Sequence, residues 1–272
     1  MELPDRTVHE MRGNVEAALG RLSQFQRTDG SFNYWPGGDH YDNWTSIYAG
    51  HFMVEAERQG FHAPPGTRAS WIAFQKRAAK QWNQERDDKW TRAAHTLTQA
   101  YRLYVLAIAG AQDMASMNRL REEKNLDASS RWSLASAYAY IGRKDVAEEL
   151  VKGYSTSVAA YTELGFTYGS DLRDEALIAD ALLNMGNTTK AALVVQQIAK
   201  HLSADDWYST QSTAFGLMAV ARLAEKNPLG KGMSYALTAN GKTQDRFSEK
   251  AIARTDLPAP DGKGKVAVDN TG

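Results

Sequence analysis

Six aspartates lie in or beside turns rich in glycine and aromatic residues, where paired carboxylates could act as general acid and base. They are Asp29, Asp39, Asp171, Asp174, Asp205 and Asp206. A glycosidase would need two such carboxyl groups roughly 5–9 Å apart. Aspartate also accepts backbone N–H bonds in turns and at helix N-termini, and that role accounts for most of these residues. A carbohydrate-active enzyme with paired carboxylates is therefore the alternative function, although the spacing selects no particular pair.

Other kinds of reactive site lack the residues that they need. The chain has no cysteine, which excludes disulfides, thiolate metal sites and a cysteine nucleophile. Its six histidines show neither the His-x3-His nor the His-Glu-x2-His spacing of zinc sites. The runs that begin at Asp87 and Asp205 both lack the final aspartate of the Asp-Asp-x-x-Asp motif that binds metal and diphosphate. We therefore expect no catalytic residue, no cofactor and no metal in this chain.

Composition and charge narrow the class of protein further. The 272 residues are 43% hydrophobic, which is enough to bury a core. Lysine plus arginine equals aspartate plus glutamate at 32 each, so no net field attracts polyanions and nucleic acid is not an expected partner. No apolar run approaches the roughly 18 residues that span a bilayer. Residues 1–6 have neither the basic nor the apolar region of a signal peptide.

Apolar residues recur at helical spacing along most of the chain. The first helix is expected from Val8 to Phe25, with Asp5 or Thr7 as its cap, and the last over about 208–225. Between them the pattern predicts helices over 44–59, 67–82, 90–109, 113–122, 132–141, 146–151, 177–185 and 190–195. Glycines follow several of these segments and are expected to end them, namely Gly60, Gly110, Gly142 and Gly186.

Two helix pairs repeat along the chain. Segment 132–151 matches segment 177–195 at an offset of 44 residues, which aligns Gly142 with Gly186 and Ala147 with Ala191. The turn glycines are unevenly spaced, unlike the turns of a tetratricopeptide array with about 34 residues per unit. Uneven pairs with long aromatic loops favour a closed ring, so we predict an all-α fold, an α/α toroid of paired helices over residues 3–228. An open α-solenoid scaffold is a third option.

The end of the chain changes character and is predicted to be a partial β domain over residues 232–272. Residues 234–239 and 265–269 alternate between apolar and polar types, and Asn240-Gly241 is a hairpin signal. A segment of about 40 residues is too short to bury a core of its own. We expect it to be the start of a longer β domain, and the whole chain to be an excised fragment.

Three loops, 29–43, 161–171 and 205–208, are rich in Tyr, Trp, Gly and Asp, and each leads into a helix. If the inner helices of a ring point their N-termini to one end, these loops form a polar and aromatic floor there. The binding residues expected on that face are Tyr34, Trp35, Trp44, Tyr48, Trp207 and Gln211. Packing of the loops onto the helix ends would explain the same residues without any ligand.

Several of these stretches resemble the thioester domain of bacterial alpha-2-macroglobulins. The first two read FQRTDGSFNYWPG, over Phe25–Gly37, and WTSIYAGHFMVEA, over Trp44–Ala56. Later motifs with the same resemblance follow in the expected order at Gly60–Pro64, Tyr168–Leu177 and Trp207–Ala214. The match covers about residues 3–226. The sequence around His51 is similar to that of family members from Bacteroidetes, which are large extracellular alpha-helical proteins.

The resemblance implies an α/α toroid, with a fold like that of terpenoid cyclases, from a broad-spectrum protease inhibitor that traps proteases. In this family a thioester links Cys and Gln of a Cys-x-Glu-Gln motif, and cleavage of a bait region exposes it to the attacking protease. That motif is not in this chain, which has no cysteine. The resemblance therefore implies a helical domain that holds and buries the thioester segment of its parent and is itself no enzyme.

The same resemblance implies partners and a location. The partners would be proteases, bound through the full-length parent, and neighbouring β domains of the same chain. The expected location is periplasmic or extracellular, with a membrane anchor in the missing N-terminal part as a further option.

Overall fold

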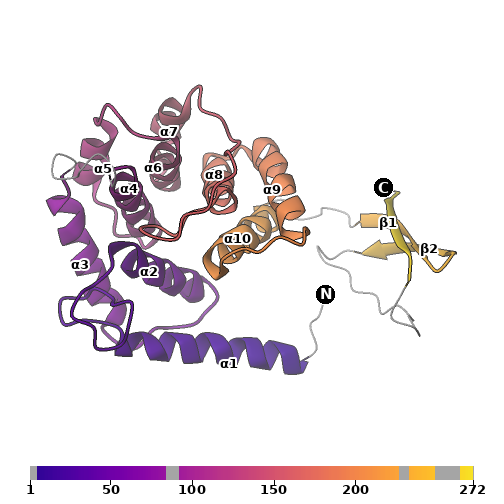
Figure 1. Ribbon diagram of the computed structural model, residues 1–272, viewed down its shortest axis with the longest axis horizontal. Helices are drawn as coiled ribbons and strands as arrows, with labels where there is room; N and C mark the ends of the chain where they lie inside the picture. The colour runs from indigo at the N-terminus through magenta and orange to yellow at the C-terminus, as the bar shows by residue number, and fades with distance from the viewer. Residues whose placement is uncertain (1–4, 84–91, 227–232, 249–263, 272) are drawn as a thin grey trace.

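The computed structural model describes residues 5–83, 92–226, 233–248 and 264–271. Within these ranges the chain forms helices followed by a small sheet (Figure 1). The helices are α1 (Asp5–Arg21), α2 (Asn43–Arg58), α3 (Thr67–Gln81), α4 (Arg92–Ile108), α5 (Met114–Arg121), α6 (Ala128–Tyr140), α7 (Lys144–Val151), α8 (Asp171–Met185), α9 (Thr188–Leu202) and α10 (Thr210–Lys226). The predicted helices are confirmed, with bounds that differ by up to seven residues, the largest difference being at the end of α9. A short 3-10 helix (Leu22–Gln24) extends α1.

The even-numbered helices form an inner ring and the odd-numbered helices surround it (Figure 1). Along the inner ring α4 packs on α6, α6 on α8 and α8 on α10. Burial follows this division, because nearly every residue of α4 and α8 from the second turn onward is buried, whereas α7 and α9 bury only one stripe. The predicted all-α toroid is thus the observed fold.

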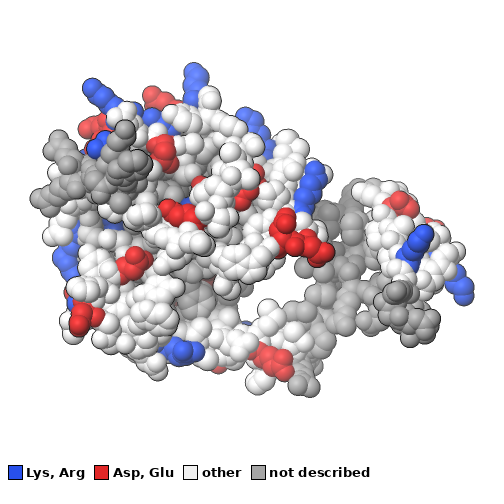
Figure 2. All heavy atoms as spheres, in the orientation of Figure 1, with Lys and Arg blue, Asp and Glu red and all other residues white. Residues whose placement is uncertain are grey.

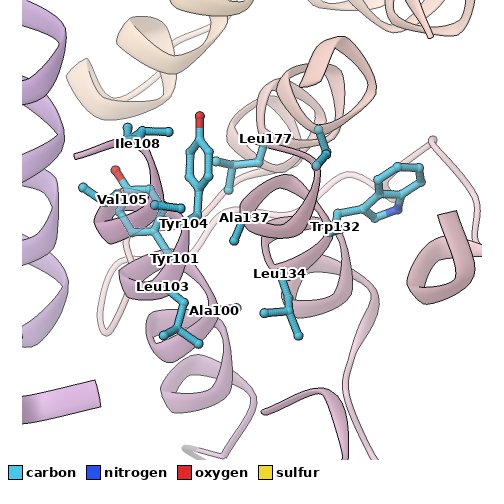
Figure 3. Close-up of a cluster of buried hydrophobic side chains, with 14 of the residues drawn as sticks. Ala100, Tyr101, Leu103, Tyr104, Val105, Ile108, Trp132, Leu134, Ala137 and Leu177 are labelled. Atoms are coloured by element: carbon cyan, nitrogen blue, oxygen red, sulfur yellow. The ribbon is translucent and has the colours of Figure 1, made fainter. Parts of the chain in front are cut away.

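The core lies between α4, α6 and α8 (Figure 3). Leu103 from α4, Leu134 from α6 and Leu177 from α8 gather there, together with the rings of Tyr101 and Tyr104. All five side chains are buried. Several alanines of the inner helices, such as Ala100, Ala137 and Ala179, are also fully buried, which lets neighbouring helices approach closely.

Four helices end in the same hydrogen-bonded glycine turn. Gly60, Gly110, Gly142 and Gly186 all have positive φ angles, between 69° and 86°. After Gly186, for example, the amide of Asn187 donates to the carbonyl of Leu182, and the other three turns make the equivalent bond. This is the pattern of a Schellman cap. The glycine turns predicted from the sequence are therefore confirmed, as is the repeat, because Ala147 and Ala191 occupy equivalent buried positions.

The end of the chain forms a three-stranded antiparallel sheet in the order β2-β1-β3. The strands are β1 (Met233–Ala239), β2 (Lys242–Ser248) and β3 (Val266–Asn270), and the turn at Asn240-Gly241 joins the first two with both φ angles positive. The sheet lies beside the ring in Figure 1. The predicted boundary between residues 228 and 232 lies outside the described residues.

Candidate functional face of the ring

Three inner helices begin at the same end of the ring and are capped by side chains. The Asp42 carboxylate accepts from the amide of Thr45 at 2.6 Å at the start of α2. Ser170 caps α8 and Ser209 caps α10 in the same way, each accepting an amide bond at 3.1 Å. The Ser170 hydroxyl lies 2.7 Å from that of Ser212, so the starts of α8 and α10 touch. Side-chain caps at these helix starts are predicted by the sequence, and Asp42, Ser170 and Ser209 provide them.

Gln211 joins all three helix starts. Its Oε1 accepts a bond of 2.6 Å from the indole Nε1 of Trp44 on α2. Its Nε2 donates to the backbone carbonyls of Thr167 and Tyr168, both at 3.0 Å, in the loop before α8. Gln211 itself lies in the first turn of α10. One amide group therefore connects segments that are 167 residues apart in the sequence.

A buried ion pair supports the Trp44 ring. The guanidinium carbon of Arg173 lies 4.9 Å from the centre of that ring, and the ring of Tyr101 stacks at a centroid distance of 4.6 Å. Arg173 Nε donates to the Asp174 carboxylate at 2.5 Å, and both residues are buried. Burial works against the charged form, but Asp174 and the Tyr161 hydroxyl together raise the pKa of Arg173. Trp44 is thereby held rigidly, and only 2% of it is exposed.

The loop that leads into α8 is held in an unusual backbone conformation. Phe166 and Tyr168 both have left-handed φ angles, 47° and 50°, which non-glycine residues rarely adopt. The Glu163 carboxylate accepts bonds from the amide and hydroxyl of Thr167, at 3.2 and 2.7 Å. Gly169 leaves room for the Arg173 guanidinium, since a Cβ there would lie 2.5 Å from one of its nitrogens. Strain of this kind persists where the surroundings fix it and is frequent at functional sites.

Exposed aromatic rings cover this end of the ring. The residues, called the ring face below, are Tyr34, Trp35, Phe166, Tyr168 and Trp207. Trp35 is 71% exposed and Trp207 is 79% exposed. Tyr34 makes an edge contact with Trp35 and stacks on Tyr168, at centroid distances of 5.2 and 6.3 Å. Figure 2 shows several Asp and Glu side chains spread over this side of the molecule, with Lys and Arg side chains mostly at its rim.

The six predicted site residues divide into three groups. Tyr34, Trp44 and Gln211 belong to one connected set through Tyr168 and the Gln211 amide. Trp35 contacts this set through Tyr34, while Trp207 projects outward. Tyr48 lies deeper, against Phe215 at 5.6 Å, and packs on the core. Whether these residues bind anything stays a prediction.

The sequence reasoning missed Glu163, Phe166 and Arg173 as members of this site. Tyr168 and Arg173 lie within a motif that carries the family resemblance, and that was the available signal. The left-handed loop and the cation over Trp44 depend on tertiary contacts, so no local pattern indicated them.

Three of the six aspartates proposed as an acid and base pair, Asp29, Asp171 and Asp174, have structural partners. Asp174 receives bonds from Arg173, Ser129 and Tyr161. Asp29 receives bonds from the amide and hydroxyl of Ser31. Across the ranges that the structure describes, no group of three or more His, Asp or Glu side chains is arranged to hold a metal ion. The geometry therefore does not favour the glycosidase alternative.

A second polar cluster, called the axial network below, lies inside the ring and joins four inner helices. It consists of His51 and Glu55 (α2), Tyr104 (α4), Asp180 (α8) and Arg222 (α10). Arg222 donates to the Glu55 carboxylate at 2.6 Å, to the Tyr104 hydroxyl at 2.9 Å and to Asp180. Burial alone would raise the pKa of Glu55, but His51 and Arg222 lower it to about 2. This network closes the ring between α2 and α10.

Comparison with known proteins agrees with the fold and the motifs. No protein-family model matches the chain. A curated alpha-2-macroglobulin of Xylella fastidiosa is 24% identical over 261 residues, which cover 89% of this chain and 15% of that protein. The chain thus spans about 15% of the length of this relative.

Comparison with solved structures also finds similarity to alpha-2-macroglobulins. Native alpha-2-macroglobulin from Escherichia coli, in a crystal structure from domain MG7 to the C-terminus, matches with a TM-score of 0.70 and 19% identity, over 96% of this chain and 39% of that one. Salmonella alpha-2-macroglobulin reacted with methylamine matches with a TM-score of 0.68 and 23% identity, over 93% of this chain and 16% of that one. The fold is therefore that of an alpha-2-macroglobulin-like helical toroid, and the resemblance to a thioester domain is confirmed.

Proposed function

We propose that this chain is the helical, thioester-domain-like part of an alpha-2-macroglobulin-like protease inhibitor, and that its ring face seats a segment of the parent protein. The observation that carries the proposal is the Gln211 junction, where three inner-helix starts meet beneath exposed aromatic rings. The likeness to alpha-2-macroglobulins, one of which is described as activated by elastase, supports the protease-trapping part.

The ring face has the properties of a surface that binds a polypeptide segment rather than those of a catalytic centre. Gln211 ties the backbone of Tyr168 to Trp44, which is itself fixed by Tyr101 and Arg173. Exposed aromatic clusters mark surfaces that bind other polypeptide segments. Near the face, the Asp29 carboxylate is engaged in a turn and the Asp174 carboxylate in an ion pair. In this role the chain holds and shields a segment and performs no reaction.

The location follows from the same proposal. A protease inhibitor of this kind would meet its targets in the periplasm or outside the cell. In the part of the chain that the structure describes, no helix has the length and apolar character needed to cross a membrane. Fractionation of the source cells, with an antibody against this chain, would test the location directly.

Protease retention by the full-length parent tests the proposed function. We expect the parent to keep labelled elastase or trypsin bound through gel filtration, and a Trp35→Ser/Trp207→Ser double variant to retain several-fold less. Leu193→Ser is the matched control, because Leu193 is an exposed apolar residue on the outer helix α9. Failure of the unmodified parent to retain either protease would overturn the proposal.

A further inference from the structure

A cavity of about 700 Å³ lies between the 29–43 loop, α3 and the first half of α4. Its walls include Trp44, Phe74, Trp82, Thr98 and Arg102. This volume is within the range that takes a small organic ligand. Five aromatic side chains line the cavity together with polar and charged groups, so it offers both apolar contact and hydrogen bonds to a ligand. Two buried groups on these walls, the Arg102 guanidinium and the indole N–H of Trp82, determine which ligand the cavity would fit.

Arg102 is a buried cation whose polar contacts are all to neutral groups. Only 4% of it is exposed. Its Nε donates to Gln75 at 2.9 Å, and its two terminal nitrogens donate to Gln99 and Asn43, each at 2.5 Å. Among the described residues no carboxylate forms an ion pair with it, in contrast to Arg173 and Arg222. Burial accordingly lowers the pKa of Arg102 to about 10.

Arg102 has more N–H donors than its three amide contacts use. A guanidinium has five N–H donors, so each terminal nitrogen keeps one further N–H beyond its amide contact. Two such donors on one planar fork suit the two oxygens of a carboxylate. An unpaired buried charge is costly, and binding an anion would offset that cost. The three amide oxygens hold the fork in place, since they come from α2, α3 and α4.

Trp82, which lines the same cavity, has a buried donor without an acceptor. The indole Nε1–H of Trp82 is buried and has no hydrogen-bond partner among the described residues. The carboxylates of Asp29 and Asp42, which also line the cavity, already accept from Ser31 and Thr45. The aromatic walls then favour a ligand with an apolar body attached to its anionic group.

We propose that this cavity binds a carboxylate carried on an aromatic body, with the carboxylate on the terminal nitrogens of Arg102 and the body against Trp44, Phe74 and Trp82. The shared chemistry admits two sources, a free aromatic acid or the C-terminal carboxylate of a peptide that ends in an aromatic residue. This site borders the ring face, because Phe166 lines the cavity as well. Its test measures ligand binding by the chain alone and so does not depend on protease trapping.

Titration of the 272-residue chain with phenylacetate tests the proposal, with binding measured by calorimetry and by the intrinsic tryptophan fluorescence of the chain. We expect phenylacetate to bind at least tenfold more tightly than phenylacetamide, which has the same body without the charge, and than acetate, which lacks the body. A peptide ending in free phenylalanine, compared with its C-terminal amide, shows whether the carboxylate of a polypeptide is also accepted. Equal binding of phenylacetate and phenylacetamide, or no binding of either, would overturn the proposal.

Two variants separate binding from folding. Arg102→Gln is expected to abolish the preference for phenylacetate, but it also alters a contact between three helices. Ala78→Phe fills the cavity from its α3 wall and leaves the amide contacts of Arg102 in place, so it should remove binding while circular dichroism is unchanged. Arg131→Gln is the matched control, because Arg131 is a partly buried arginine that stacks on Tyr154, outside this cavity. Unchanged phenylacetate binding by a folded Ala78→Phe variant would contradict the site.

Discussion

At the scale of single residues, neutral amides and paired charges hold the ring together in different ways. Gln211 satisfies one indole donor and two backbone carbonyls at the helix starts. The axial network instead pairs Arg222 with Glu55 and Asp180 inside the ring. Both sets join α2 to α10, the first and last inner helices. Removing either set of contacts should therefore destabilise the closed ring, but only the contribution of the charged set to stability should change with pH.

Replacing Gln211 by alanine should lower the free energy of unfolding by about 1–3 kcal/mol, because the Trp44 donor and two carbonyls lose their partner. Urea unfolding followed by circular dichroism measures this change. Gln197→Ala on the exposed side of α9 is the matched control and should stay within about 0.5 kcal/mol of the unmodified chain. Equal effects of the two variants would contradict a special role for Gln211.

The pKa of Glu55 predicts a loss of stability in acid. Its folded-state pKa, about 2, lies below the ordinary value of 4.5, so its ionised form stabilises the fold. This contribution is present in full above pH 4.5 and is lost as the pH falls toward 2. The upper limit is about 3 kcal/mol for a shift of this size. Urea unfolding at several pH values should show a shallower decline over this window for Glu55→Gln, while the exposed Glu225→Gln control declines like the unmodified chain.

At the scale of elements, glycine has opposite roles in a turn and in a helix. Gly142 ends α6 with a φ of 86°, and a Cβ added there would meet no atom within 4 Å. Gly13 lies on the exposed side of α1, and a Cβ there would also meet nothing within 4 Å. Any difference between the two positions therefore reports backbone conformation and not packing.

Gly142→Ala should destabilise the chain by about 1 kcal/mol, because alanine adopts the left-handed conformation at a cost. Gly13→Ala should stabilise α1 by up to about 1 kcal/mol, since alanine is the better helix former. Thermal unfolding of the two variants beside the unmodified chain measures both shifts. Shifts of the same sign would contradict the assignment of Gly142 to a helix cap.

At the scale of the whole molecule, the sequence predicts what is local and misses what ring closure creates. Helical spacing and the glycine turns indicated the elements and the toroid, because both depend on residues close in the chain. The bond between Trp44 and Gln211 joins residues 167 apart, as does the one between Arg222 and Glu55. Such contacts exist only once α10 meets α2, so no local pattern could have indicated them. The sequence could not predict that Arg102 is buried without a carboxylate partner for the same reason, since its three partners come from three helices.

Ring and sheet are expected to be separate units, as the predicted division at residues 228–232 implies. The ring closes on itself through contacts between α2 and α10, whereas β1 packs on β2 and β3 within its own sheet. A chain that ends at residue 228 should therefore keep the cooperative helical transition of the full chain, with a midpoint within about 4 °C, which corresponds to less than about 1–2 kcal/mol for a chain of this size. Residues 232–272 alone should not fold, because so short a segment buries too little surface. Circular dichroism at 222 nm during heating follows both pieces. A broad, non-cooperative transition in the shortened chain would show that the sheet is part of the ring's core.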